Sequence, residues 1–184
     1  MGDIKSAREI AQEKADKLGE LSPEERRKQR EDRCHLTGKS LTDKYLNGHD
    51  VKRLEAELNK YNNEDKESIR QKALSQLIER IDLRNGFVLD RISQGILSLA
   101  KTETSTGTMG KIKELFQEYK EAEEGEGQGI EKAGREILHQ LRISGTAIGQ
   151  INIRAKEEWQ KKLEEMTPPF EERLSKLKQE LISA

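Results

Sequence analysis

The sequence predicts an all-α protein: an elongated antiparallel helical bundle with a looser helical N-terminal region. Ala, Glu, Lys, Leu and Arg make up half of the 184 residues, which is typical of long helices and coiled coils. Valine occurs only twice and aromatic residues form 4% of the chain, so the side chains that usually pack a β-sheet are scarce. Leu, Ile, Val and Phe together account for 40 residues, so the core must be narrow.

Charge is abundant but balanced, with 34 basic and 35 acidic residues and a formal net charge of -1. A compact globule with this composition would remove many ions from water, so thin apolar stripes or a partner's surface fit better. No apolar run approaches the ~18 residues of a membrane span, and the first residues lack a secretory signal. The single cysteine, Cys34, agrees with a reducing compartment. We therefore expect a cytoplasmic protein that does not enter a membrane.

Residues 1–62 are expected to form a charged helical region. A weak apolar face indicates a short helix over residues 3–20. The next helix should begin at Ser22, which can cap it while Glu25 completes a capping box. That helix, from Pro23 to about His35, contains no large apolar residue. It therefore has no face to bury.

Two dipeptides that end in glycine, Thr37-Gly38 and Asn47-Gly48, are interpreted as connectors in the later part of this region. Asp50 should cap a short helix that ends near Tyr61.

Residues 63–184 are expected to form the helical bundle, with a flexible loop near residues 102–110. The strongest helical period covers residues 64–83. Asn85-Gly86 then indicates a helix break, although the flanking alternation also fits a hairpin turn. Helical spacing resumes over residues 88–99, which favours the break.

The second half of the bundle is expected to contain three helices. The first covers residues 111–124 and is interrupted by the glycine-rich stretch 125–129. A long helix follows from Ile130 to Met166, unless residues 146–153 open into an extended turn. Thr167-Pro168-Pro169 should end that helix and begin a terminal one, over residues 170–181.

No motif predicts catalysis, and we expect no cofactor. Residues 106–111 resemble a phosphate loop only superficially, because they lack the first glycine and the final Ser or Thr of that motif. Glu136 and His139 have the i, i+3 spacing with which helical carboxylate sites hold a metal. A helical metal-carboxylate enzyme is therefore one alternative, with these two residues as weak candidate ligands.

A basic stripe is the main candidate for contact with a partner. Arg26, Arg30 and Arg33 share one face of their helix, so a nucleic-acid or ribosome-associated protein is a second alternative. Against it, residues 1–62 contain 14 basic and 13 acidic residues, so long-range attraction of nucleic acid would be weak.

Three residues near the C-terminus could also contact a partner. Gly145 and Gly149 would let another backbone approach closely, and Trp159 is either a core residue or an interface anchor. Balanced charge, few aromatics and a small apolar inventory favour a non-enzymatic protein–protein interaction protein, such as an adaptor, scaffold or assembly factor. Its partner would be another protein or a second copy of the chain, forming an oligomer.

Overall fold

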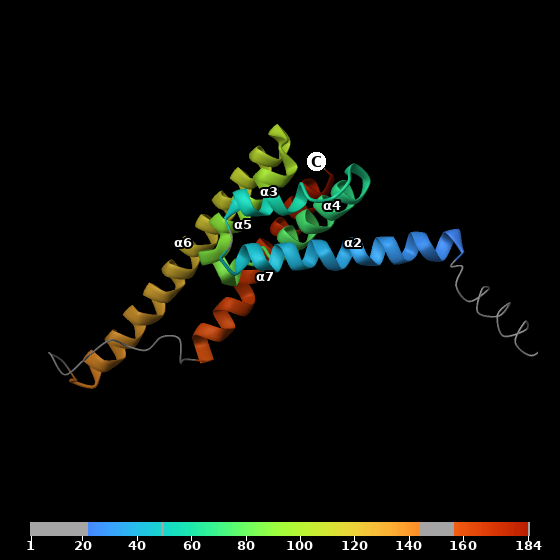
Figure 1. Ribbon diagram of the computed structural model, residues 1–184. Coiled ribbons are helices and arrows are strands. Elements are labelled where there is room, and N and C mark those ends of the chain that lie inside the picture. The colour runs from blue at the N-terminus through green and yellow to red at the C-terminus, as the bar shows by residue number, and fades with distance from the viewer. Residues whose placement is uncertain (1–21, 49, 144–156, 184) are drawn as a thin grey trace, which may run out of the picture.

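The protein is all-α within the residues that the computed structural model describes, 22–48, 50–143 and 157–183. Its helices form an antiparallel bundle from which long segments extend (Figure 1). The elements are α2 (Pro23–Leu46), α3 (Val51–Leu58), α4 (Asn63–Glu79), the 3₁₀ helix η1 (Leu83–Val88), α5 (Leu89–Ala100), α6 (Glu103–Gln140) and α7 (Glu157–Ser183). The helix predicted over residues 3–20 lies outside the described ranges.

One hydrophobic core joins all of these elements. The C-terminal half of α2 packs on α4, which also contacts α5 and α7, while α6 packs mainly on α7. Side chains with almost no exposed surface form its centre: Tyr45, Ile69, Leu77, Ile78, Ile81, Ile92, Ile96, Leu99, Met109, Ile112, Leu115 and Leu181. The core therefore includes α2 and α3 as well as the helices after residue 62.

Helix α2 begins as predicted but is longer. The Ser22 hydroxyl accepts a hydrogen bond from the Glu25 amide, and the Glu25 carboxylate accepts one from the Ser22 amide, which completes the capping box. The connector expected at Thr37-Gly38 is wrong, because α2 continues to Leu46. Gly38 is buried against α4, where a Cβ atom would lie 2.8 Å from the Lys72 Cβ. This glycine permits a close helix contact and does not end the helix.

The middle of the chain follows the prediction closely. The Asp50 carboxylate caps α3 by accepting a hydrogen bond from the Arg53 amide at 2.8 Å. Helix α4 ends at Glu79, four residues before the expected boundary. Asn85-Gly86 lies within η1, where Asn85 has non-helical dihedral angles. The preferred helix break is confirmed, and the hairpin is not formed.

Helix α6 contradicts two expectations, since it is continuous from Glu103 to Gln140. The flexible loop near 102–110 is wrong: Thr102 caps the helix, and Ser105 and Met109 are buried in the core. The interruption at 125–129 is also wrong. Glycine and threonine lower helix propensity by only about 1 kcal/mol or less each, and packing of one helical face overrides that cost.

The long helix expected from Ile130 to Met166 is wrong as well. Helix α6 ends where Arg142 adopts a left-handed φ of 57°, and the Ile143 amide donates back to the Leu138 carbonyl at 2.9 Å. This pattern is the Schellman ending of a helix. The extended turn considered for residues 146–153 lies outside the described residues.

Helix α7 runs antiparallel to α6. Lys162 pairs with Glu126, Arg173 with Glu118 and Lys111 with Glu180, so residue numbers rise along α7 as they fall along α6. The helix end expected at Thr167-Pro168-Pro169 is wrong, since both prolines lie inside α7. Packing of α7 on α6 supports this segment, because the Phe170 and Tyr119 rings meet edge-on with their centroids 5.3 Å apart.

A long arm extends from the bundle (Figure 1). It consists of the C-terminal part of α6 and the N-terminal part of α7, and we call residues 114–140 and 157–172 the α6–α7 arm. The inner turns of both segments still pack on the core, and the outer turns extend beyond it. The first half of α2 extends in another direction (Figure 1). None of the helices in the described part of the chain is both long and apolar enough to cross a membrane.

Candidate partner-binding surfaces

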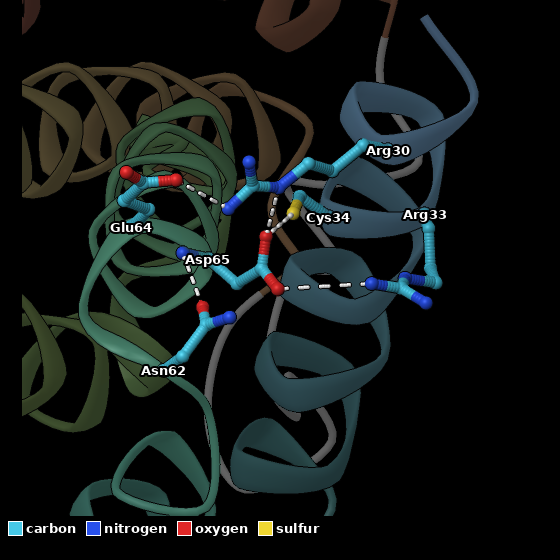
Figure 2. Close-up of polar contacts among 6 residues, drawn as sticks. All are labelled: Arg30, Arg33, Cys34, Asn62, Glu64 and Asp65. Atoms are coloured by element: carbon cyan, nitrogen blue, oxygen red, sulfur yellow. Dashed lines mark hydrogen bonds and ion pairs between the residues drawn. The ribbon is translucent and has the colours of Figure 1, made fainter. Parts of the chain in front are cut away.

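A cluster of polar side chains fastens α2 to the beginning of α4 (Figure 2). The Arg30 guanidinium donates to the Asp65 carboxylate at 2.5 Å and to the Glu64 carboxylate at 2.8 Å. Arg33 lies 3.7 Å from the other Asp65 oxygen, and the Cys34 thiol lies 3.7 Å from the first. Because the Asp65 side chain is only 11% exposed, its charge depends on these partners.

The pKa values of the cluster reflect this arrangement. The hydrogen bond from Arg30 lowers the pKa of Asp65, which keeps the carboxylate charged. Burial raises the pKa of the Cys34 thiol, and the Asp65 charge adds to the effect. The thiol is therefore protonated at neutral pH, which disfavours it as a nucleophile.

This cluster changes the interpretation of the basic stripe. Arg26, Arg30 and Arg33 do share one side of α2, but Arg30 and Arg33 are directed at Asp65 (Figure 2). Their charge is therefore partly used within the fold. The sequence does not predict Asp65 as the partner of Arg30, because 35 residues separate them and no local spacing relates them.

Acidic side chains are concentrated on the α6–α7 arm. Its two segments contain 14 carboxylates and 5 Lys or Arg residues. By contrast, residues 22–113 and 173–183 contain 16 acidic and 22 basic residues. The nearly neutral total therefore conceals an acidic arm on a basic bundle, and local fields of this kind steer charged partners.

The end of the arm exposes large apolar side chains. Ile137 is 58% exposed, Leu141 is 65% exposed and Ile143 is 46% exposed. We call these three residues the arm tip. They lie within seven consecutive positions that include the end of α6 and the residues just after it. Grouped apolar side chains of this kind are typical of interaction sites.

The candidate metal ligands Glu136 and His139 are also near the arm tip. Both side chains are exposed. The residues that the structure describes contain no group of three His, Cys, Asp or Glu side chains placed to hold a metal ion. The pair therefore gains no third ligand from the described chain.

A cleft of about 680 Å³ lies at the base of the arm, between η1, α6 and α7. Leu83, Leu163 and Pro168 give it apolar surface, and Arg84 and Gln160 also line it. The Tyr119 and Thr167 hydroxyls also line it and lie 3.3 Å apart. Three carboxylates border it, from Glu123, Glu164 and Glu171, and only Glu171 has a basic partner on the described chain, Arg84 at 3.9 Å.

Trp159 is buried within the arm. A Cβ atom at Gly127 would lie 3.5 Å from the Trp159 ring, so the indole packs directly against the α6 backbone. As the structure places it, Trp159 joins the two helices of the arm. Gly145 and Gly149 lie outside the described residues.

Comparison of the chain with protein family models, with curated proteins and with solved structures finds no match.

Proposed function

We propose that this chain is a non-enzymatic protein–protein interaction protein, an adaptor, scaffold or assembly factor, and that it binds its partner through the α6–α7 arm. The observation that carries the proposal is the arm tip. Ile137, Leu141 and Ile143 remain exposed on a segment that extends away from the core. Burying such side chains against a partner releases about 25 cal/mol for each Å² of apolar surface removed from water.

The architecture supports this role. The bundle supplies a folded base, and the arm presents its tip and its acidic sides at a distance from that base (Figure 1). Trp159 and the Tyr119–Phe170 contact hold α6 and α7 together, so the arm offers a preorganised surface.

The nucleic-acid alternative is less well supported. The arm extends from the bundle, and its excess of carboxylates repels phosphate groups. On α2, two of the three predicted arginines already contact Asp65.

Cross-linking in a nuclease-treated native extract tests the proposal. A photo-reactive residue at position 136 should cross-link to a stoichiometric protein partner. The double variant Ile137→Gln/Leu141→Gln should lose that partner. The matched double variant Leu36→Gln/Ile182→Gln, which changes exposed apolar residues outside the arm, should keep it. Equal recovery with both variants, or no cross-link from position 136, would contradict the proposed role of the arm.

A further inference from the structure

The cleft at the base of the arm is lined by both charged and apolar side chains, whereas the arm tip is apolar. Arg84 lies close to Glu171, while Glu123 from α6 and Glu164 from α7 stand at the border without a basic partner in the described chain, so the cleft has a net negative charge. Glu123 is half-buried and Glu164 is exposed. A ligand that fits this arrangement has an apolar body and a positively charged end.

Pro168 of α7 adds a second feature to the same wall. Proline has no amide hydrogen, so Pro168 cannot donate to the carbonyl group four residues earlier, at Glu164. Both residues line the cleft. The Glu164 carbonyl therefore lacks its usual helical donor, and Pro168 contributes apolar surface to the cleft beside the unpaired carboxylates.

We propose that this cleft receives a lysine or arginine side chain from a basic segment of a partner protein. The aliphatic stem would pack on Leu163 and Pro168, as long basic side chains do on apolar surfaces, and its charged end would reach Glu123 and Glu164. The negative charge of the whole arm would attract the segment from solution. This inference rests on the proposed function and specifies the chemistry of its partner.

Other occupants fit less well. A metal ion needs several ligands close together, and the described residues contain no such group. A second copy of the chain would have to supply a basic segment, and among the described helices the extended half of α2 is the candidate. Residues 23–33 contain five basic and four acidic residues, so that helix offers little net attraction.

Peptide binding tests the inference on the full chain. The probe is a labelled amphipathic peptide of leucine and lysine, compared with the same peptide in which every lysine is acetylated. Acetylation keeps the stem and removes the charge. The lysine peptide should bind at low salt, the acetylated peptide at least about fivefold more weakly, and raising the salt from about 0.1 M to about 1 M should weaken binding further, because it shortens the Debye length to about 3 Å.

Two double variants locate the site. Glu123→Gln/Glu164→Gln should weaken binding of the lysine peptide at least about fivefold, because it removes both unpaired carboxylates. The control Glu24→Gln/Glu103→Gln removes the same charge from exposed positions outside the arm and should change affinity less than about twofold. Circular dichroism should show the same helix content for both variants.

Three results would overturn the inference: no binding of the lysine peptide, equal binding of the acetylated peptide, or equal weakening by the two double variants. Preferential binding of a single-stranded RNA would also overturn it. These outcomes differ from failure of the proposed function. If a partner without a basic segment cross-links at the arm tip, the arm still binds proteins and only the assignment of the cleft is wrong.

Discussion

Asp65 shows how one carboxylate can hold two helices together. It accepts the Arg30 hydrogen bond and lies near Arg33 and Cys34. It stands in the first turn of α4, where its own amide donates to the Asn62 side chain at 3.0 Å (Figure 2). A negative charge in the first turn also interacts favourably with the helix dipole. Loss of this charge should therefore loosen α2 from α4.

We predict that Asp65→Asn lowers the urea midpoint of unfolding at neutral pH, and that the difference from the wild type disappears in acid. Folding lowers the pKa of Asp65 below its ordinary value of 3.8. The stabilisation is thus complete well above pH 3.8 and is lost as the pH falls through the folded-state pKa.

Urea unfolding of both proteins at pH 7 and at several acidic pH values provides the measurement. Asp32→Asn, at an exposed position of the same helix, serves as the control and should match the wild type. A constant difference between Asp65→Asn and the wild type at every pH would show that the charge of Asp65 does not stabilise the fold.

The sequence pattern identifies the arginines of this cluster but not Asp65, to which they bind. The helical spacing of Arg26, Arg30 and Arg33 placed them on a shared face, and Ser22 and Asp50 were identified as caps because capping is local. The partner of Arg30 depends on how α2 packs on α4, and no spacing along the chain encodes that packing. The same holds for Glu123 and Glu164, which meet at the cleft only because α7 returns along α6.

Glycine accounts for most of the errors at the scale of helices. The sequence pattern at Thr37-Gly38 predicts a connector, yet Gly38 lies inside α2 where α2 and α4 approach closely. At Arg142 the opposite occurs, because α6 ends in a left-handed residue where glycine is usual and none is present. Proline misled in the same way at Pro168 and Pro169, whose helix is supported by packing on α6.

Replacement of Gly38 by alanine should destabilise the fold by about 1 to 3 kcal/mol, since overpacking forces neighbouring atoms to move. A Cβ atom there would lie 2.8 Å from the Lys72 Cβ and 3.1 Å from two backbone atoms of α4. Gly110→Ala is the matched control, because its Cβ would meet no atom within 4 Å other than those of its chain neighbours and its own helical backbone. That change should stabilise α6 by up to about 1 kcal/mol. Urea denaturation measures both, and opposite signs are required.

Removing a proline from α7 should raise stability. An interior proline costs a helix about 3 kcal/mol, so Pro169→Ala is expected to increase the free energy of unfolding by about 1 to 3 kcal/mol. Ser175→Ala, at an exposed position of the same helix, provides the reference and should gain no more than about 0.5 kcal/mol. If thermal and urea unfolding show a loss for Pro169→Ala, the proline stabilises this segment by fixing its backbone.

The net charge and the composition of the whole molecule do not show how its charge is distributed between the arm and the bundle. The net charge of -1 conceals an acidic arm and a basic bundle, and the elongated form follows from a 38-residue helix on a narrow core. The all-α class and the elongated shape could be predicted because composition and helical spacing are properties of the sequence. The position of the arm could not, because it depends on where α6 ends.

The radius of gyration should exceed that of a compact chain of this length. A globular protein of 184 residues would have a value of about 16 Å, whereas α6 alone has a length of about 57 Å. Small-angle X-ray scattering measures this value directly. A value near 16 Å would mean that the arm folds back onto the bundle in solution.

The continuity of α6 gives the arm the mechanics of a lever. Its outer 27 residues, from position 114 to position 140, have a length of about 40 Å, so a tilt of about ten degrees at the bundle would move the tip by about 7 Å. Motion would be transmitted in the other direction as well. A force that displaces the tip sideways would rotate α6 slightly where it leaves the bundle, near the hydroxyl pair of Tyr119 and Thr167.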